Sequence, residues 1–124
     1  MKKLLIIPML FMCSIVIGQY KEIIGNPIKI EKFEVAQNDF PKEMTSNKAK
    51  KACYALGSRW RLPTKDELDI LYRNKYEIGG FAKYYYWSST ENGDGNAWVQ
   101  GFGSGGRSSF DKDWKFIVRA VRAF

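Results

Sequence analysis

The separation of helix signals from strand signals is the feature that most restricts how this chain can fold. Helical patterns fill residues 45–80, whereas residues 84–124 consist of aromatic strand segments divided by glycine-rich turns. Alternating strands and helices would indicate a parallel sheet, but consecutive helices followed by consecutive strands favour an α+β domain. A chain of 124 residues is long enough for one domain with a real core. We therefore predict an α+β fold with two helices packed on a twisted antiparallel sheet.

Two segments are predicted to form these helices. The first begins at Thr45 or Ser46 and ends at Gly57, because hydroxyl side chains cap helix starts and glycine terminates helices. The second begins with a capping box, in which the Thr64 hydroxyl accepts from the third amide and Glu67 reaches back. Each segment carries one apolar stripe at helical spacing. The two stripes are Ala49, Ala52, Cys53 and Leu56, and then Leu68, Leu71 and Tyr72.

Strand signals lie on both sides of the helices. Ile28 and Ile30 alternate with polar residues, but Phe33 and Val35 fall on the opposite parity. One or two strands with a break near Glu31 are therefore expected. After the helices, strands alternate with turns. The predicted strands are 84–89, 97–102 and 115–124, and the predicted turns are 91–96 and 103–109. The last strand is expected to end inside the fold.

The first 18 residues are typical of a secretory signal. Lys2 and Lys3 precede an apolar run that is too short to cross a bilayer comfortably, and Gly18 offers a small residue for cleavage. An uncleaved membrane anchor or a buried strand are the alternatives. Lipidation at Cys13 is disfavoured, because the residues before it are bulky.

This prediction divides the chain into three parts. They are an export signal at 1–18, a spacer with the first strand at 19–32, and a binding domain at 33–124. The expected location is outside the cell or in the cell envelope, with the export signal as the sole expected contact with a membrane.

Composition argues against several classes of function. The chain has 20 basic and 13 acidic residues, a surplus without a basic block, so nucleic-acid binding is not expected. Once the signal is removed, Cys53 is the single cysteine, which rules out an internal disulfide and a cysteine-pair metal site. The chain contains no histidine, so a nucleophilic triad is excluded and Cys53 is predicted to be a core residue. No cofactor or metal is expected.

Two other functions stay open. Glu91 and Asp94 share a polar loop and could act as acid and base on a polysaccharide. The same loop, with Asn92 and Asn96, offers oxygen ligands but lacks the spacing of the familiar calcium loop. The chain could also be a structural subunit of a surface assembly that makes contact through exposed tyrosines.

The aromatic residues of the last third favour a binding surface. A strand cannot bury both faces against one core, so at least one of Tyr84, Tyr85 and Tyr86 must face outward. Phe110 and Trp114 lie among small polar residues. Rigid rings among adaptable polar residues are typical of recognition surfaces.

Three motifs resemble one family of bacterial proteins. They are Trp60-Arg61-Leu62-Pro63-Thr64-Lys65-Asp66-Glu67-Leu68, Tyr86-Trp87-Ser88-Ser89-Thr90 and Val118-Arg119-Ala120-Val121-Arg122. Their type and order resemble the Lcl C-terminal domain-like family over residues 33–124. This resemblance implies a C-type-lectin-like fold that serves binding and not catalysis. The catalytic cysteines of the formylglycine-generating enzymes, which are related by fold, have no counterpart here. It also implies that Trp60 and Trp87 pack in the core, and that Arg61, Arg119 and Arg122 pair with carboxylates or carbonyls.

A narrower resemblance covers residues 96–124. This segment is similar to the C-terminal repeat of proteins diversified by retroelements, which vary surface residues on a fixed backbone. The resemblance implies a fixed frame of Trp98, Phe102, Val118 and Val121. The implied ligand-binding positions are Val99, Gly101, Gly103, Ser104, Arg107, Ser109, Phe110, Asp111, Asp113, Trp114, Lys115 and Phe116. The sequence thus predicts a module that recognises a glycan or a surface protein through its C-terminal loops and strands.

Overall fold

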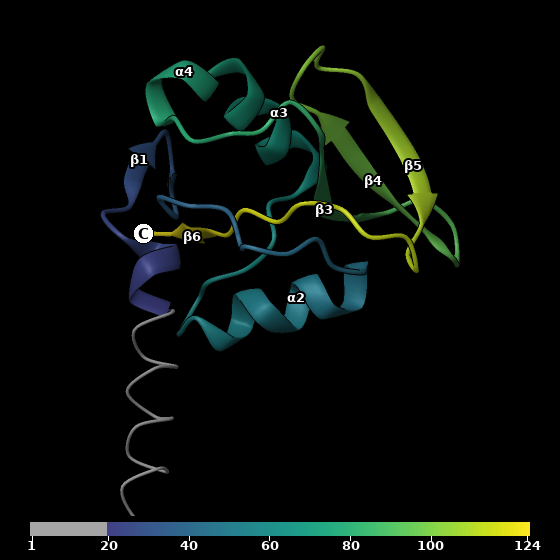
Figure 1. Ribbon diagram of the computed structural model, residues 1–124, viewed down its shortest axis with the longest axis horizontal. Coiled ribbons are helices and arrows are strands. Elements are labelled where there is room, and N and C mark those ends of the chain that lie inside the picture. The colour runs from purple at the N-terminus through teal and green to yellow at the C-terminus, as the bar shows by residue number, and fades with distance from the viewer. Residues whose placement is uncertain (1–19) are drawn as a thin grey trace, which may run out of the picture.

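Two three-stranded antiparallel sheets organise the molecule in a computed structural model that describes residues 20–124 (Figure 1). The predicted export signal lies outside the described residues. The first sheet joins β1 (Ile28–Ile30), β2 (Phe33–Val35) and β6 (Val121–Ala123) in that order. The second joins β3 (Tyr85–Glu91), β4 (Asn96–Gly101) and β5 (Arg107–Asp111). The α+β prediction is confirmed, although the strands divide between two sheets.

The first sheet brings the start and the end of the domain together. Ile30 pairs with Phe33 across a tight turn, in which Glu31 has a φ of 53°. This turn is the break predicted near Glu31, where the alternation of apolar residues shifts by one position. Glu34 of β2 lies opposite Arg122 of β6, and the two side chains form an ion pair. The pairing of the last strand with β2 therefore closes the fold.

The helices begin at the predicted caps. In α2 (Ser46–Ala55), the Thr45 side chain accepts a hydrogen bond from the Lys48 amide. In α3 (Lys65–Arg73), both halves of the capping box between Thr64 and Glu67 are present. A short helix, α4 (Lys75–Ile78), follows before Gly79. Among residues 20–124, no helix has the length and apolar character needed to cross a membrane.

The core consists of two clusters on the two faces of the second sheet. Trp87 of β3 packs with the α2 residues Ala49 and Cys53, whereas its neighbour Tyr86 packs with residues of α3. The helices accordingly lie on opposite sides of β3 (Figure 1). Trp60 and Trp87 are 1% and 0% exposed, which confirms their predicted place in the core. Burial raises the pKa of Cys53 to about 12, so this thiol is a core group and not a nucleophile.

Arginine side chains connect the clusters to the surrounding loops. Arg119, which is 1% exposed, donates from Nε to Asp39 Oδ1 at 2.7 Å. The Tyr86 hydroxyl donates to the other Asp39 oxygen at 2.6 Å. Burial raises the pKa of Tyr86, and its hydrogen bond to Asp39 adds to this effect. The predicted pairing of Arg119 is therefore confirmed.

Arg61 and Glu67 form a second, half-exposed pair. Two hydrogen bonds of 2.6 and 2.9 Å join the Arg61 guanidinium to the Glu67 carboxylate. Burial alone would raise the pKa of Glu67, but bonds from Arg61 and Thr64 outweigh it and lower the pKa. With the Arg122–Glu34 pair, all three arginine predictions are confirmed.

Residues 20–24, predicted as part of a spacer, form a helical turn, and Ile23 in this turn belongs to the core. The prediction of a strand over 115–124 that ends inside the fold is wrong. The final strand is limited to Val121–Ala123, and the Phe124 side chain is 57% exposed. Irregular backbone, tied by single bridges at Phe116 and Ile117, replaces most of the predicted strand.

Candidate binding surface

Strand pairing divides the predicted binding residues between two faces of the β4–β5 hairpin. Phe110 lies opposite Ala97, on the face that packs toward α2, whereas Ser109 lies opposite Trp98 on the other face. Val99 is 1% exposed and Gly101 is buried. A ligand cannot reach either residue, so both must be removed from the predicted surface. The other ten predicted residues are at least partly exposed.

The turn at Gly103 and Ser104 forms a separate end of the hairpin. Asn96 lies opposite Asp111, so Asp111 to Phe116 follow at the end of β5 that is distant from this turn. Gly105, in the same turn, has a φ of 84°, and a Cβ there would lie 2.6 Å from the Tyr72 ring. Close packing on α3 therefore requires glycine here. The predicted residues do not form one continuous surface.

At the other end of β5, four rings form what we call the aromatic cluster: Tyr85, Phe110, Trp114 and Phe116. The Phe110 ring centroid is 5.1 Å from that of Phe116, 5.2 Å from that of Trp114 and 5.5 Å from that of Tyr85. Phe116 in turn lies 5.0 Å from the buried Trp87 at an edge-to-face angle of 71°. The cluster thus extends the core to the surface, where Trp114 is 56% exposed.

Local hydrogen bonds hold the Trp114 turn in place. The Asp113 amide donates to the Asp111 carboxylate at 2.8 Å, and the Trp114 amide donates to the Asp111 carbonyl at 3.1 Å. Beyond the turn, Phe116 exchanges two backbone hydrogen bonds with Met44, of 2.9 and 3.0 Å. Short Asp side chains favour such turns because they bond to the backbone two residues ahead. The exposed tryptophan is therefore presented on a fixed backbone.

Charged residues surround Trp114. Asp111, Asp113 and Lys115 are exposed on the same turn. The intervening Lys112 donates to Glu91 at 2.5 Å. Apolar rings within a polar rim are the arrangement expected of a binding surface.

The Lys112 contact also bears on the hydrolase alternative. Its hydrogen bond lowers the pKa of Glu91, which therefore stays ionised at neutral pH. A general acid in a glycosidase needs the opposite shift. Asp94 lies in the exposed β3–β4 turn. Within residues 20–124, no group of three acidic or cysteine side chains is placed to hold a metal ion.

The opposite face of the hairpin has a different character. Trp98, expected to be part of the fixed frame, is half-buried, and Lys65 Nζ lies 3.6 Å from its ring centroid. Asn92 donates to the Ser109 hydroxyl at 2.9 Å. Here α3 covers the sheet near Gln100 through a 3.0 Å hydrogen bond to Asp69. Trp98, Ser109 and Gln100 on this face thus already contact other side chains of the domain, which makes them less available to a ligand.

Tyr85 is the functional candidate that the sequence did not single out. Strand alternation required one outward tyrosine among three, and the structure identifies Tyr84 and Tyr85, at 70% and 38% exposure. Of these, Tyr85 joins the aromatic cluster through Phe110 and Phe116. The register that pairs Tyr85 with Gly101 leaves room for its ring.

Solved structures with the same fold define the class of protein. A chain of the botrocetin crystal structure superimposes with a TM-score of 0.60 at 11% identity, covering 81% of this chain and 98% of that chain. A chain from a complex of botrocetin with a mutant A1 domain of von Willebrand factor gives 0.57 at 10% identity, with the same coverage. A chain from rhodocetin in complex with the integrin α2-A domain gives 0.58 at 11% identity, again covering 81% and 98%. The domain therefore has a C-type-lectin-like fold.

The family follows from the sequence itself. Residues 30–122 match the model of the Lcl C-terminal domain. A search of curated proteins found no match. The chain belongs to the Lcl C-terminal domain family, as its three motifs predicted.

Proposed function

We propose that this chain is a protein-recognition module that contacts its partner through the aromatic cluster. The observation that carries the proposal is the exposed Trp114 ring, which stands on Phe110 and Phe116 and through them on the core. We further propose that it acts outside the cell or in the envelope, after the predicted signal at residues 1–18 is removed.

Energetics favour recognition at this cluster. A tryptophan offers a large apolar area, and central aromatic residues contribute most of the binding energy in many interfaces. Because the Trp114 backbone is fixed on both sides, little conformational entropy is lost when a partner orders it. Exposed Asp111, Asp113 and Lys115 then supply charges that select among partners.

The chemistry of the surface favours a protein over a glycan. The Phe110 ring is tilted by 33° to the Trp114 ring and by 54° to the Phe116 ring, so the cluster presents an uneven apolar patch. The botrocetin and rhodocetin structures named above include complexes with protein domains, so this fold is compatible with such partners. Glycan recognition becomes an outcome of the test below.

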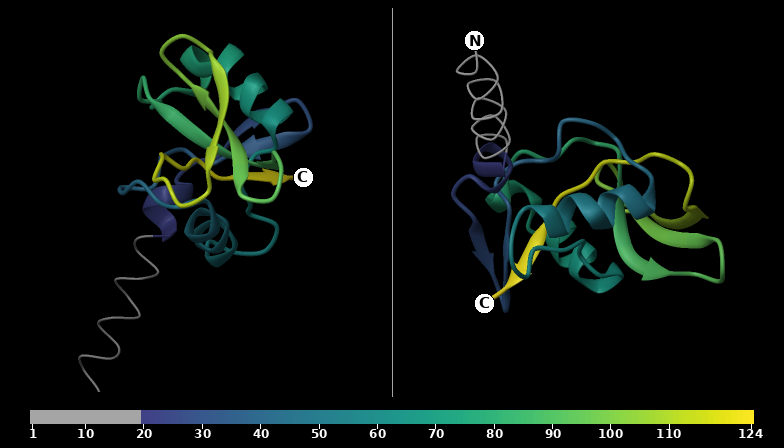
Figure 2. Two further views of the ribbon diagram at one scale, coloured as in Figure 1. Left: turned by 90° about the vertical axis from the view of Figure 1, so that its right-hand side faces the viewer. Right: turned by 90° about the horizontal axis from the view of Figure 1, so that it is seen from below.

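The test uses a protein microarray and a glycan array, each probed with the full chain and two variants. Trp114→Ala should weaken binding to protein ligands by about 10- to 100-fold, in line with loss of a central aromatic contact. Tyr76→Ala removes a tyrosine that is 92% exposed on α4, a helix that lies away from the C-terminal end of β5 (Figure 1 and Figure 2), and should leave binding unchanged. Equal binding by the parent and Trp114→Ala, or ligands found on the glycan array alone, would reject the proposal.

A further inference from the structure

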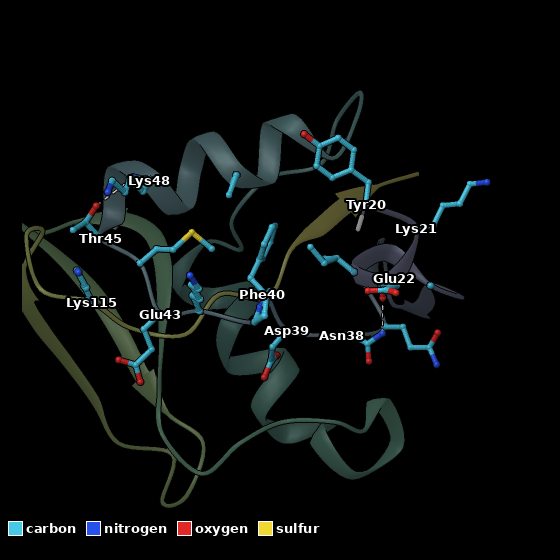
Figure 3. A pocket seen from close by; sticks show the side chains of 17 residues that line it. Tyr20, Lys21, Glu22, Asn38, Asp39, Phe40, Glu43, Thr45, Lys48 and Lys115 are labelled. Atoms are coloured by element: carbon cyan, nitrogen blue, oxygen red, sulfur yellow. Dashed lines mark hydrogen bonds between the residues drawn. The ribbon is translucent and has the colours of Figure 1, made fainter. Parts of the chain in front are cut away.

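A groove adjoins the Trp114 turn at Lys115. It extends from there along α2 to the helical turn at residues 20–24. It has a volume of about 1110 Å³ and runs between residues 20–24, the segment 37–45 and α2 (Figure 3). Its apolar lining comes from Ile23, Phe40, Met44 and Ala52. Small-molecule sites usually have volumes of about 300–1,000 Å³, so this open groove suits a longer ligand.

Backbone hydrogen bonds hold the walls of the groove in place. The amide of Asn38 donates to the Ile23 carbonyl at 3.1 Å, which attaches the helical turn to the 37–45 segment. The Phe40 amide donates to the Val118 carbonyl at 3.0 Å, and Met44 is paired with Phe116. The groove is thus preformed, which reduces the entropy lost when a ligand binds.

Positive charge is concentrated at the groove. Four lysines line it, and none of them forms an ion pair within residues 20–124: Lys21, Lys42, Lys48 and Lys115. The acidic lining residues compensate only in part. Both oxygens of Asp39 are already engaged by Arg119 and Tyr86, which leaves Glu22 and Glu43. The first turn of α2 contains no acidic residue.

The charge is also unevenly placed along the groove. Lys48 and Lys115 lie near Thr45 at one end together with the single carboxylate of Glu43, whereas Glu22 and Lys21 lie at the other end (Figure 3). Phe40 lies between these ends (Figure 3), and Met44 also lines the groove. A ligand with an acidic group at one end and an apolar body along the middle would match both features.

We propose that the groove binds an extended, acidic and apolar segment of a protein partner. Its apolar side chains pack on Phe40 and Met44, and its carboxylates lie beside Lys48 and Lys115. The proposal rests on the proposed function, since it takes the ligand to be a protein. Lys115 follows Trp114 directly, so one partner can contact the aromatic cluster and continue into the groove. Methionine adapts its shape to different apolar side chains, which suits such a site.

The probe is a phage-displayed library of random 12-residue peptides panned on the full chain, with selected peptides resynthesised and measured by fluorescence anisotropy. Ala52→Trp places a large side chain in the groove. Lys48→Glu with Lys115→Glu reverses the charge at one end. The matched control, Lys32→Glu with Lys51→Glu, changes net charge equally at exposed lysines that do not line the groove. Circular dichroism verifies that each variant is folded.

Selected peptides should be rich in Asp or Glu and in large apolar residues. Both groove variants should weaken peptide binding at least tenfold at low salt, whereas the control pair should change it less than threefold. Basic or charge-independent peptides, or binding unaffected by either groove variant, would overturn the proposal. Binding of the full chain to anionic lipid vesicles in place of acidic peptides would overturn it as well.

The two proposals fail separately. Peptides that lose affinity for the groove variants but not for Trp114→Ala support the groove, whatever the array experiment gives. If Trp114→Ala weakens binding to array proteins while the groove variants bind peptides like the parent, the groove proposal falls and the proposed function stands.

Discussion

Replacing Arg119 by methionine is expected to lower the free energy of unfolding by about 3–5 kcal/mol. The substitution leaves the Asp39 carboxylate without its 2.7 Å partner and removes the guanidinium that donates to the Ala36 carbonyl at 3.2 Å. Loss of one member of a buried pair is costly, because the remaining charge keeps its desolvation penalty without compensation. Denaturant unfolding followed by circular dichroism measures the effect, with an unchanged m-value expected.

Arg73→Met is the matched control for this prediction. The Arg73 side chain is 63% exposed, and its contact with Asp69 is 3.2 Å long. Exposed pairs within a helix contribute about 0.3–0.5 kcal/mol, so this variant should be nearly as stable as the parent. A loss below about 1 kcal/mol for Arg119→Met would show that the Asp39–Arg119–Tyr86 network does not hold the core and the surrounding loops together as described.

Phe110→Ala is expected to destabilise the domain by about 2–4 kcal/mol, and Trp114→Ala by less than about 1 kcal/mol. Phe110 is half-buried and contacts three rings, so its removal leaves a cavity beneath the aromatic cluster. Trp114 lies over these rings with 56% of its surface already exposed. Thermal unfolding checks both values, at about 4 °C of Tm per kcal/mol for a domain of this size.

This difference in stability distinguishes two roles within the aromatic cluster: Phe110 supports the cluster, whereas Trp114 contacts the partner. The sequence predicted that Phe110 and Trp114 both belong to the binding surface. In the structure, Phe110 lies opposite Ala97 on the inner face of the hairpin, whereas Trp114 is carried outward by its turn. Equal and small losses for the two variants would contradict these distinct roles.

Local patterns explain why much of the fold could be predicted. The capping box at Thr64 and the parity change at Glu31 depend on residues a few positions apart, so the sequence displays them directly. The motifs also indicated the buried Trp60 and Trp87 and the arginine pairs.

Long-range packing explains the errors. Both faces of the second sheet are covered, by α2 and by α3, so alternation alone could not show that Val99 is buried and Trp98 half-buried. The groove depends on a hydrogen bond between Ile23 and Asn38. These residues are far apart in the sequence, so no local pattern could predict their contact.

The measurement that tests the central claim most directly is hydroxyl-radical footprinting of the full chain with and without a protein ligand from the microarray. Oxidation of Trp114, read by mass spectrometry, should fall several-fold in the complex, with a smaller decrease at the half-buried Phe110. Tyr76, on α4, should be oxidised at the same rate in both samples. Unchanged oxidation of Trp114 in a saturated complex, with protection elsewhere on the domain, would contradict recognition through the aromatic cluster.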